Sequence, residues 1–269
     1  MTTAARDPST PYTFDNSAPT GGRLLEALSQ MFDGFTAVRL TKAGIRPGAR
    51  CLEIGAGAGT VAVWMAEQVG PDGEVIATDP KPQHVPAHGR LTALRHNVIT
   101  DPLPDGKFDL IHARAVLQHL PQRREVLAKL VDALAPGGSV VIEEIEARWG
   151  AAVLATPDPR AHGIFERYET AVLAALKANG NDPTWARGVH QTLRDLGLAD
   201  VNSEGWQGSY EGGTGSCLLA HSGSTELRER LIEVGMPAED LDVMATLTLD
   251  PRLVLRGLLL LSTSGRTAA

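Results

Sequence analysis

The chain carries the stretch Glu53-Ile54-Gly55-Ala56-Gly57-Ala58-Gly59. The apolar run at residues 50–52 predicts the end of a strand before it, and the apolar spacing of residues 60–67 predicts a buried helix after it. Gly55 and Gly57 have no Cβ, so the backbone can turn with positive φ and approach a ligand closely, while Gly59 lets the helix pack on the strand. A ligand carboxylate at the start of this helix would meet free amide donors.

A second predicted strand, residues 74–78, ends in Asp79. An acidic residue at this place accepts both ribose hydroxyls of a bound nucleoside. The glycine loop and the acid together predict a nucleoside, and two cofactor classes fit. A dinucleotide motif needs glycine one place beyond Gly59, where this chain has Thr60. An NAD-linked oxidoreductase is therefore the alternative with less support.

Composition places the chain among ordinary globular proteins. Its 269 residues are 43% hydrophobic and 21% charged, which suits a sizeable core. The formal charge of -7 and the lack of a Lys/Arg cluster argue against a nucleic-acid partner. The longest apolar run, residues 253–261, is interrupted and too short to span a bilayer, so we expect no membrane association.

The N-terminal residues 1–11 lack an apolar signal segment, and the chain has two cysteines, Cys51 and Cys217. Two cysteines give neither a disulfide framework nor a zinc spacing, so we expect a cytoplasmic protein without a bound metal. The sequence leaves the oligomeric state open, with a homodimer among the options.

Strand and helix patterns alternate from residue 50 to residue 144, which predicts an α/β fold with a mostly parallel sheet. Helical spacing at residues 23–28 and 31–42 ends near Gly44. After residue 144 two helices, at 161–178 and 183–196, interrupt the alternation and are expected to form a cap. The expected division is an N-terminal arm and helices at 1–44, a core at 45–145, a helical cap at 146–199 and a completion of the sheet at 200–269.

Two further segments carry a family resemblance. Residues 108–121, Phe-Asp-Leu-Ile-His-Ala-Arg-Ala-Val-Leu-Gln-His-Leu-Pro, and residues 134–138, Leu-Ala-Pro-Gly-Gly, resemble the later motifs of class I S-adenosylmethionine-dependent methyltransferases, and the glycine stretch resembles their motif I. In particular, these segments are similar to those of actinobacterial small-molecule enzymes of specialised metabolism, and the family resemblance covers residues 50–144 and, more loosely, 12–16. The resemblance implies a Rossmann-like class I methyltransferase fold with a seven-stranded sheet.

The resemblance also implies a set of cofactor contacts for S-adenosylmethionine. The family commonly has aspartate where this chain has Asn97, but the amide oxygen still accepts a hydrogen bond from the adenine amino group. The Asn-Pro-Pro-Tyr motif of amino-directed nucleic-acid and protein methyltransferases is missing after the fourth strand, so adenine amines and glutamine amides are poor acceptors. The implied contacts are Glu53, Gly55, Ala56, Gly57 and Gly59 to the methionine end, Asp79 and Pro80 to the ribose, Asn97 and Val98 to the adenine, and Ala113 and Arg114 beside the methionine end.

Methyl transfer is an in-line displacement that depends on alignment, and a base helps where the acceptor carries a proton. His119 is the first choice for this base, and its alternative is a structural helix histidine. Glu144 is a second candidate, although the interpretation that its position favours is a solvated strand end. Tyr12 would close over the cofactor or donate to the acceptor, against an apolar plug.

Aromatic residues cluster in the arm and in the segments after residue 144. They would either line a pocket for a planar acceptor or form the cap's own core, and the second interpretation suits most of them individually. The predicted function is methyl transfer to the carbon, oxygen or nitrogen of a small, largely apolar and in part aromatic natural product in specialised metabolism. The remaining alternatives are an NAD-linked oxidoreductase and a non-catalytic S-adenosylmethionine-binding protein.

Overall fold

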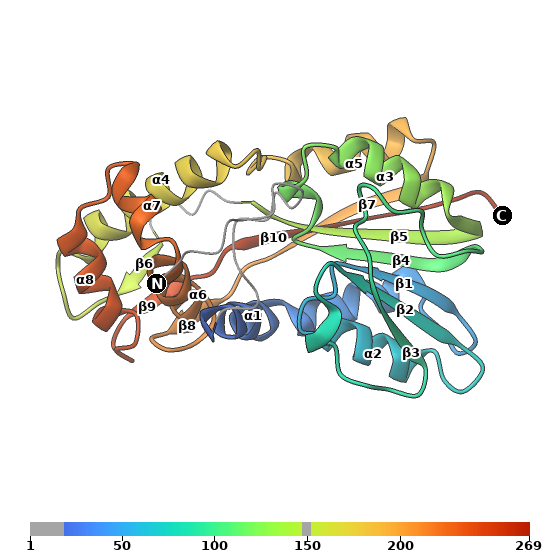
Figure 1. Ribbon diagram of the computed structural model, residues 1–269, viewed down its shortest axis with the longest axis horizontal. Coiled ribbons are helices and arrows are strands. Elements are labelled where there is room, and N and C mark those ends of the chain that lie inside the picture. The colour runs from blue at the N-terminus through green and yellow to red at the C-terminus, as the bar shows by residue number, and fades with distance from the viewer. Residues whose placement is uncertain (1–18, 147–151) are drawn as a thin grey trace.

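The computed structural model describes residues 19–146 and 152–269. Its main layer is a seven-stranded sheet in the order β3-β2-β1-β4-β5-β10-β7 (Figure 1). Strands β1 to β5 are parallel, and β10 is antiparallel to both of its neighbours. This mostly parallel sheet confirms the predicted Rossmann-like architecture. The strands are β1 Arg50–Ile54, β2 Glu74–Asp79, β3 Leu91–Arg95, β4 Phe108–Arg114, β5 Leu134–Glu146, β7 Ala199–Trp206 and β10 Leu259–Arg266.

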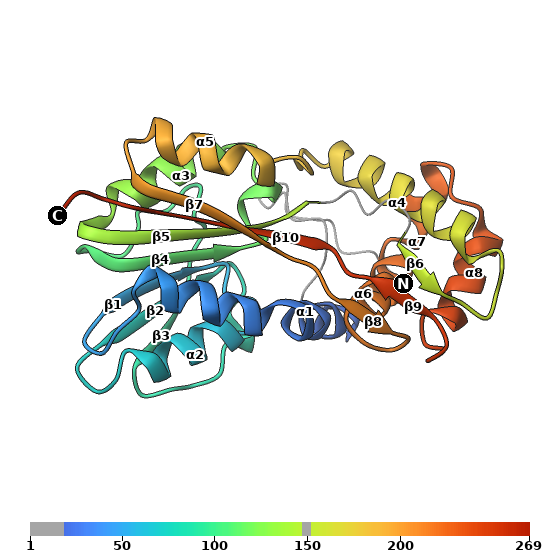
Figure 2. The same cartoon turned by 180° about the vertical axis from the view of Figure 1, so that it is seen from behind.

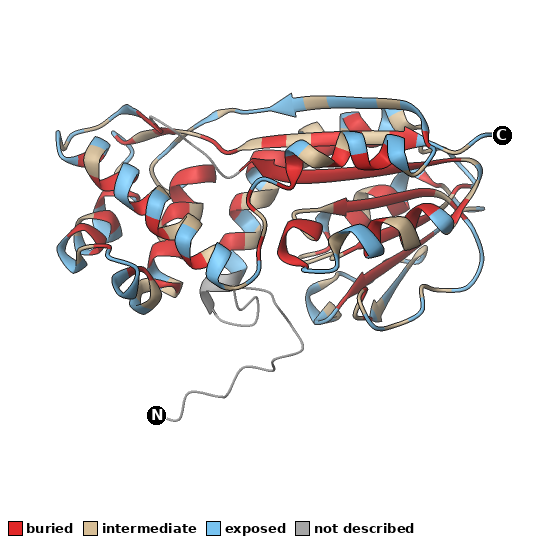
Figure 3. Cartoon of the chain, turned by 90° about the horizontal axis from the view of Figure 1, so that it is seen from above, coloured by how far each residue is buried: buried red, intermediate tan, exposed pale blue. Residues whose placement is uncertain are grey.

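Helices cover both faces of this sheet because its central strands are apolar on both sides. Helix α2 (Thr60–Gln68) and the second half of α1 (Pro19–Ala43) pack on the face that carries Cys51 and Leu110. Helix α3 (Arg123–Asp132) packs on the opposite face. Figure 3 shows the buried residues concentrated along the strands between these layers.

Helix α1 is one continuous helix, whereas the sequence predicted two. Gly34 lies inside it without ending it, and Gly44 follows its last residue at φ 98°, the left-handed conformation typical of a helix C-terminus. Its first half packs along helix α6 (Gly215–Glu226), and its second half packs on the sheet. The helix therefore joins the two parts of the molecule. The predicted anchor at residues 12–16, with Tyr12, lies outside the described residues.

The second part of the molecule is a helical cap beyond the carboxyl edge of the sheet (Figures 1 and 2). A small sheet in the order β6-β9-β8 lies within it. Its core joins side chains from α4, α6, α7, α8 and β9, among them Phe165 and Met244. Its further elements are β6 Val153–Ala155, α4 Ala161–Ala178, β8 Ser209–Glu211, α7 Arg228–Glu233, α8 Ala238–Leu247 and β9 Val254–Arg256.

The structure differs from the predicted cap of residues 146–199 in two respects. Helix α5 (Ala186–Asp195) packs on the sheet rather than in the cap, because Trp185, Val189 and Leu193 are buried in the same cluster as α3. Conversely, α6 to α8 belong to the cap although they follow β7. The apolar run at residues 253–261 is also divided between β9 of the cap and β10 of the main sheet.

Among the helices of residues 19–146 and 152–269, none combines the length and apolar character that crossing a bilayer requires.

A buried guanidinium binds α1 to β10 and β7, the last two strands in the order of the main sheet. Arg39 is 2% exposed, and its Nε donates to Ser262 Oγ at 3.0 Å while Nη1 reaches Asn202 Oδ1 at 3.1 Å. Nη1 also forms an ion pair with Glu204, which the exposed Lys42 shares. The two cations have one carboxylate in common but differ in burial.

We expect Arg39→Ala to lower the free energy of unfolding by about 2–4 kcal/mol, because it leaves buried polar partners unsatisfied and removes packed methylenes. Lys42→Ala is the matched control and should change it by less than about 0.5 kcal/mol. Denaturant unfolding measures both variants. Equal small effects would show that the buried guanidinium contributes no more than the exposed ammonium.

Candidate functional site

The glycine loop between β1 and α2 has the backbone that its sequence predicts. Gly55, Gly57 and Gly59 have φ of 69°, 55° and 77°, all left-handed, and Gly59 is the N-cap of α2. The amides of Gly55 and Ala56 both donate to the carbonyl of Thr78, at 2.7 and 3.1 Å. A Cβ at Gly55 would lie 2.4 Å from Cγ2 of Val116. The loop is therefore a tight turn that side chains would strain and obstruct.

Asp79 at the end of β2 is bound to this loop. Its Oδ2 accepts the Gly57 amide at 3.0 Å, and its Oδ1 accepts the Lys81 amide at 2.7 Å. Each carboxylate oxygen can accept more than one hydrogen bond, so both keep capacity for a ligand hydroxyl. The structure thus brings the predicted ribose acid and the predicted glycine loop together. Pro80, the other predicted ribose contact, is exposed beside it.

Three ionisable side chains form a buried row across the neighbouring strands β1, β4 and β5. Nδ1 of His112 lies 2.6 Å from Oε2 of Glu53, and its Nε2 lies 3.4 Å from Oε2 of Glu143. All three side chains are at most 4% exposed. Burial by itself lowers the pKa of His112, but the two carboxylates outweigh it and raise this pKa to about 9. At neutral pH the ring is an imidazolium between two carboxylates.

The sequence reasoning missed Glu143, which it passed over for Glu144. Burial acts to raise the pKa of Glu143, but hydrogen bonding from His112 is the leading opposing effect, and the net pKa is lowered. In β5, residues 141, 143 and 145 share one face by strand alternation. An acid on that face of an apolar strand, next to the strand of His112, was the signal available.

Helix α1 supplies the next layer around this row. Thr36 Oγ1 donates to Glu143, and the Arg114 guanidinium donates to Thr36 Oγ1 at 3.0 Å and to Asp33 Oδ1 at 2.7 Å. Arg114 therefore holds α1 against the end of β4. Ala113 is fully buried, and its side chain lies in the core on the other face of the sheet. A ligand contact at Ala113 would thus come from its backbone.

The turn after β4 contains a strained residue. Ala115 has φ 53°, which is uncommon for a residue other than glycine, and its amide donates to the Glu143 carbonyl at 2.7 Å. The short helix η2 (Leu117–His119) follows. The turn places Val116 over Gly55 of the glycine loop.

Glu144 on β5 binds the backbone of this turn. It is fully buried, and its Oε1 accepts the amides of Leu117 at 2.8 Å and Gln118 at 3.3 Å. Burial raises the pKa of Glu144 to about 8, against the lowering effect of these amides. The predicted alternative of a solvated strand end is wrong for this residue. Its contacts favour support of the turn, and its role as a base stays a prediction.

His119 at the end of η2 points to the segment between α4 and α5. Its Nδ1 is hydrogen-bonded to the side-chain oxygen of Asn181, and its ring is 8% exposed. Burial lowers the pKa of His119 to about 4, although the Asn181 bond opposes the shift. The ring is neutral at physiological pH and weakly basic. These contacts suit a structural histidine, and the predicted role as a general base stays a prediction.

The predicted adenine contacts lie in the loop after β3. Asn97 Oδ1 accepts the Ile99 amide at 3.0 Å, and the Asn97 amide donates to Asp101 Oδ2 at 2.8 Å. Val98 is 7% exposed and belongs to the core. The side-chain oxygen of Asn97 therefore orders its own loop and keeps one lone pair for a further donor. Asp101 is an acceptor of this loop that the sequence reasoning did not single out.

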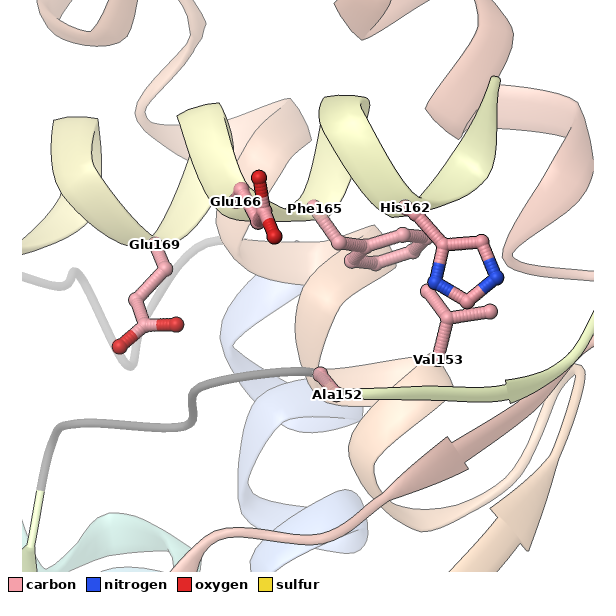
Figure 4. Close-up of a pocket in the computed structure, with 6 residues that line it drawn as sticks. All are labelled: Ala152, Val153, His162, Phe165, Glu166 and Glu169. Carbon is pink, nitrogen blue, oxygen red and sulfur yellow. The ribbon is translucent and has the colours of Figure 1, made fainter. Parts of the chain in front are cut away.

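A small pocket lies beside α4 in the cap (Figure 4). Phe165 forms its apolar wall, whereas Tyr168 is buried in the cap and Trp185 on the sheet. Trp206 stacks on Phe35 with ring centroids 6.0 Å apart. Most aromatic residues in the part of the chain that the structure describes therefore serve packing rather than a pocket. The pocket is lined by Ala152, Val153, His162, Phe165, Glu166 and Glu169.

Within residues 19–146 and 152–269, no group of three or more His, Cys, Asp or Glu side chains is placed to hold a metal ion.

The raised pKa of Glu144 predicts a pH dependence of stability. Between its ordinary value of 4.5 and its folded value of about 8, only the unfolded chain releases the proton, so the free energy of unfolding falls as pH rises. Glu144→Gln keeps an acceptor oxygen and cannot titrate. The wild type should therefore lose stability relative to this variant between pH 5 and pH 8.

Denaturant unfolding at several pH values measures this difference, with Glu67→Gln at an exposed helix position as the control substitution. A stability difference between wild type and Glu144→Gln that does not change with pH would contradict the assignment.

Comparison with known proteins places this geometry in a family. The family model described as "Methyltransferase domain" matches residues 27–182, more than half of the chain. Methyltransferase str2 of Strobilurus tenacellus is 34% identical over 167 residues, which cover 61% of this chain and 58% of that protein. The ubiquinone/menaquinone biosynthesis C-methyltransferase UbiE of Cupriavidus necator is 32% identical over 119 residues, 41% of this chain and 49% of the relative. The chain thus spans about half the length of the curated relatives that it matches.

A solved structure shows the same fold at low sequence identity. Phosphoethanolamine N-methyltransferase 2 of Haemonchus contortus, in complex with phosphomonomethylethanolamine and S-adenosylhomocysteine, aligns with a TM-score of 0.55 at 15% identity, over 93% of this chain and 58% of that one. The architecture is accordingly the Rossmann-like fold of class I methyltransferases. With its glycine loop, its strand-end acid and the matched span of residues 27–182, the chain belongs to the methyltransferase domain family.

Proposed function

We propose that this chain is an S-adenosylmethionine-dependent methyltransferase that acts on a small-molecule acceptor. One observation carries the proposal: the Asp79 carboxylate is bound to the amide of Gly57, inside the loop that has glycine at three of its five positions. A carboxylate that suits ribose hydroxyls and a backbone that a ligand can approach closely thus lie side by side. S-adenosylmethionine would supply an electrophilic methyl group on its sulfonium.

The residues at the sheet edge fit this cofactor. The buried carboxylate of Glu53 suits its ammonium group, and the start of α2 suits its carboxylate. Asp79 and Pro80 would hold the ribose, and Asn97 with Val98 the adenine. A side chain at Gly57 would press on helix α1, since its Cβ would lie 3.0 Å from Leu25.

The chain's own contribution to the reaction is binding and alignment. Displacement at a sulfonium needs the acceptor atom in line with the bond that breaks, and positioning can supply several kcal/mol of the barrier. Two elements would border the reacting group. One is the turn at residues 115–119, which Glu144 binds, and the other is helix α1, which Arg114 binds. His119, Glu144 and Tyr12 remain our candidates for proton transfer.

The acceptor we propose is a small, largely apolar natural product, aromatic ones included, with carbon, oxygen or nitrogen as the methylated atom. The name of UbiE places that relative in quinone biosynthesis, and the Haemonchus enzyme was solved with phosphomonomethylethanolamine, a small phosphorylated amine. The formal net charge of -7 disfavours a polyanionic acceptor such as nucleic acid. Turnover with nucleic acid alone would overturn this part.

Two expectations from the sequence stay proposals. They are a cytoplasmic location and a homodimer.

A labelled-methyl assay with extracts of small metabolites tests the reaction. Transfer of label to an extractable product is the expected result. Binding of S-adenosylmethionine without any transfer would support a non-catalytic binding protein, and binding of NADH in its place would support an oxidoreductase.

Asp79→Asn should weaken binding of S-adenosylhomocysteine about 10- to 100-fold, because a charged acceptor for the ribose hydroxyls is lost. Asp72→Asn, in the exposed turn before the same strand, is the matched control and should leave binding unchanged. Calorimetry gives the dissociation constants, and thermal unfolding verifies that both variants are folded. An unaltered dissociation constant for Asp79→Asn would contradict the ribose assignment.

A further inference from the structure

We infer that His112 is a positioning residue for the cofactor's amino-acid end: as a cation between Glu53 and Glu143, it orients the Glu53 carboxylate toward the ligand ammonium. This inference rests on the proposed function. It assigns an indirect role, through Glu53, to a histidine that is fully buried.

The geometry of the row is specific. His112 pairs with Glu53 in the register of β1 and β4, so the two side chains lie side by side on one face of the sheet. Glu53 Oε2 is 2.6 Å from one ring nitrogen and Glu143 Oε2 is 3.4 Å from the other. With Oε2 of Glu53 bound to the ring, we assign Oε1 to the ligand.

The charges support a cationic ring. Nδ1 is hydrogen-bonded to Glu53, and Nε2 lies within ion-pair distance of Glu143 without a hydrogen bond of its own. Two carboxylates on adjacent strands would repel each other without a cation between them. The pKa of His112, raised to about 9, agrees with this state. The Glu143 side is fixed in turn by Thr36, to which Arg114 donates.

The row carries one net negative charge, from two carboxylates and one imidazolium. A ligand ammonium at Glu53 neutralises it. Without the cation, the buried Glu53 carboxylate loses the hydrogen-bond partner that fixes its orientation. A carboxylate that is not held toward the ligand binds an ammonium more weakly, whereas contacts to the nucleoside at Asp79 stay the same.

Two ligands distinguish a positioning role of His112 from general structural support. S-adenosylhomocysteine has the amino-acid end, and 5′-methylthioadenosine shares its nucleoside and thioether but lacks that end. His112→Gln removes the cation and keeps a polar side chain. We expect it to weaken S-adenosylhomocysteine about 10- to 100-fold and 5′-methylthioadenosine by less than about threefold.

The matched control is His221→Gln. This histidine lies on α6 in the cap, where its Nδ1 is bonded to Thr248 at 3.1 Å. It should leave the affinity ratio of the two ligands at the wild-type value. Equal weakening of both ligands by His112→Gln would overturn the inference and show a structural role, and so would no weakening of either.

A measurement on the wild type covers the case in which His112→Gln does not fold. NMR of nitrogen-labelled histidine should show both ring nitrogens of His112 protonated at neutral pH, and a neutral ring would overturn the inference. Wild-type protein that binds neither nucleoside would instead contradict the proposed function, so the two failures are distinguishable.

Discussion

Four glutamates lie buried at the carboxyl edge of the sheet, one of them, Glu146, in an ion pair with Arg187. The way in which the other three are compensated determines the arrangement of the site. A buried carboxylate needs a counter-charge, hydrogen-bond donors or a proton. Glu53 and Glu143 share the imidazolium of His112, with Thr36 as a further donor. Burial raises the pKa of Glu144 to about 8, and its carboxyl group accepts two backbone amides. The two glutamates on one face are therefore compensated by a shared histidine, and Glu144 on the other face is compensated by backbone donors.

These two kinds of compensation act in two different parts of the site. The charged row lies beneath the glycine loop, where a cofactor's polar end would bind, and it ties α1 to the sheet through Arg114. Glu144 binds the backbone of the turn after β4, which contains the left-handed Ala115. Strain of this kind persists only where the surroundings determine the conformation. Helix α1 reaches from the sheet to α6, so the same helix links the cofactor side to the cap.

Much of the fold was predictable because its signals are local. The glycine loop, the strand-end Asp79 and the alternation from residue 50 to 144 each follow from neighbouring residues. The placement of α5 on the sheet and of α6 to α8 in the cap was not predictable. Helical periodicity shows that a helix has a buried face, but it does not show which surface covers that face. The row through Glu143 needed the register of three strands, which local sequence does not give. The surroundings of His119 likewise depend on Asn181, which lies 62 positions further along the chain.

The central claim is that the first strand–loop–helix unit holds a sulfur-containing nucleoside by its amino group and by its sugar. A crystal structure of the complex with S-adenosylhomocysteine tests it most directly. The account predicts the ligand ammonium within hydrogen-bonding distance of Glu53 and both ribose hydroxyls on Asp79, along the loop of residues 55–59. A ligand bound elsewhere, or one with its sugar directed away from Asp79, would contradict it.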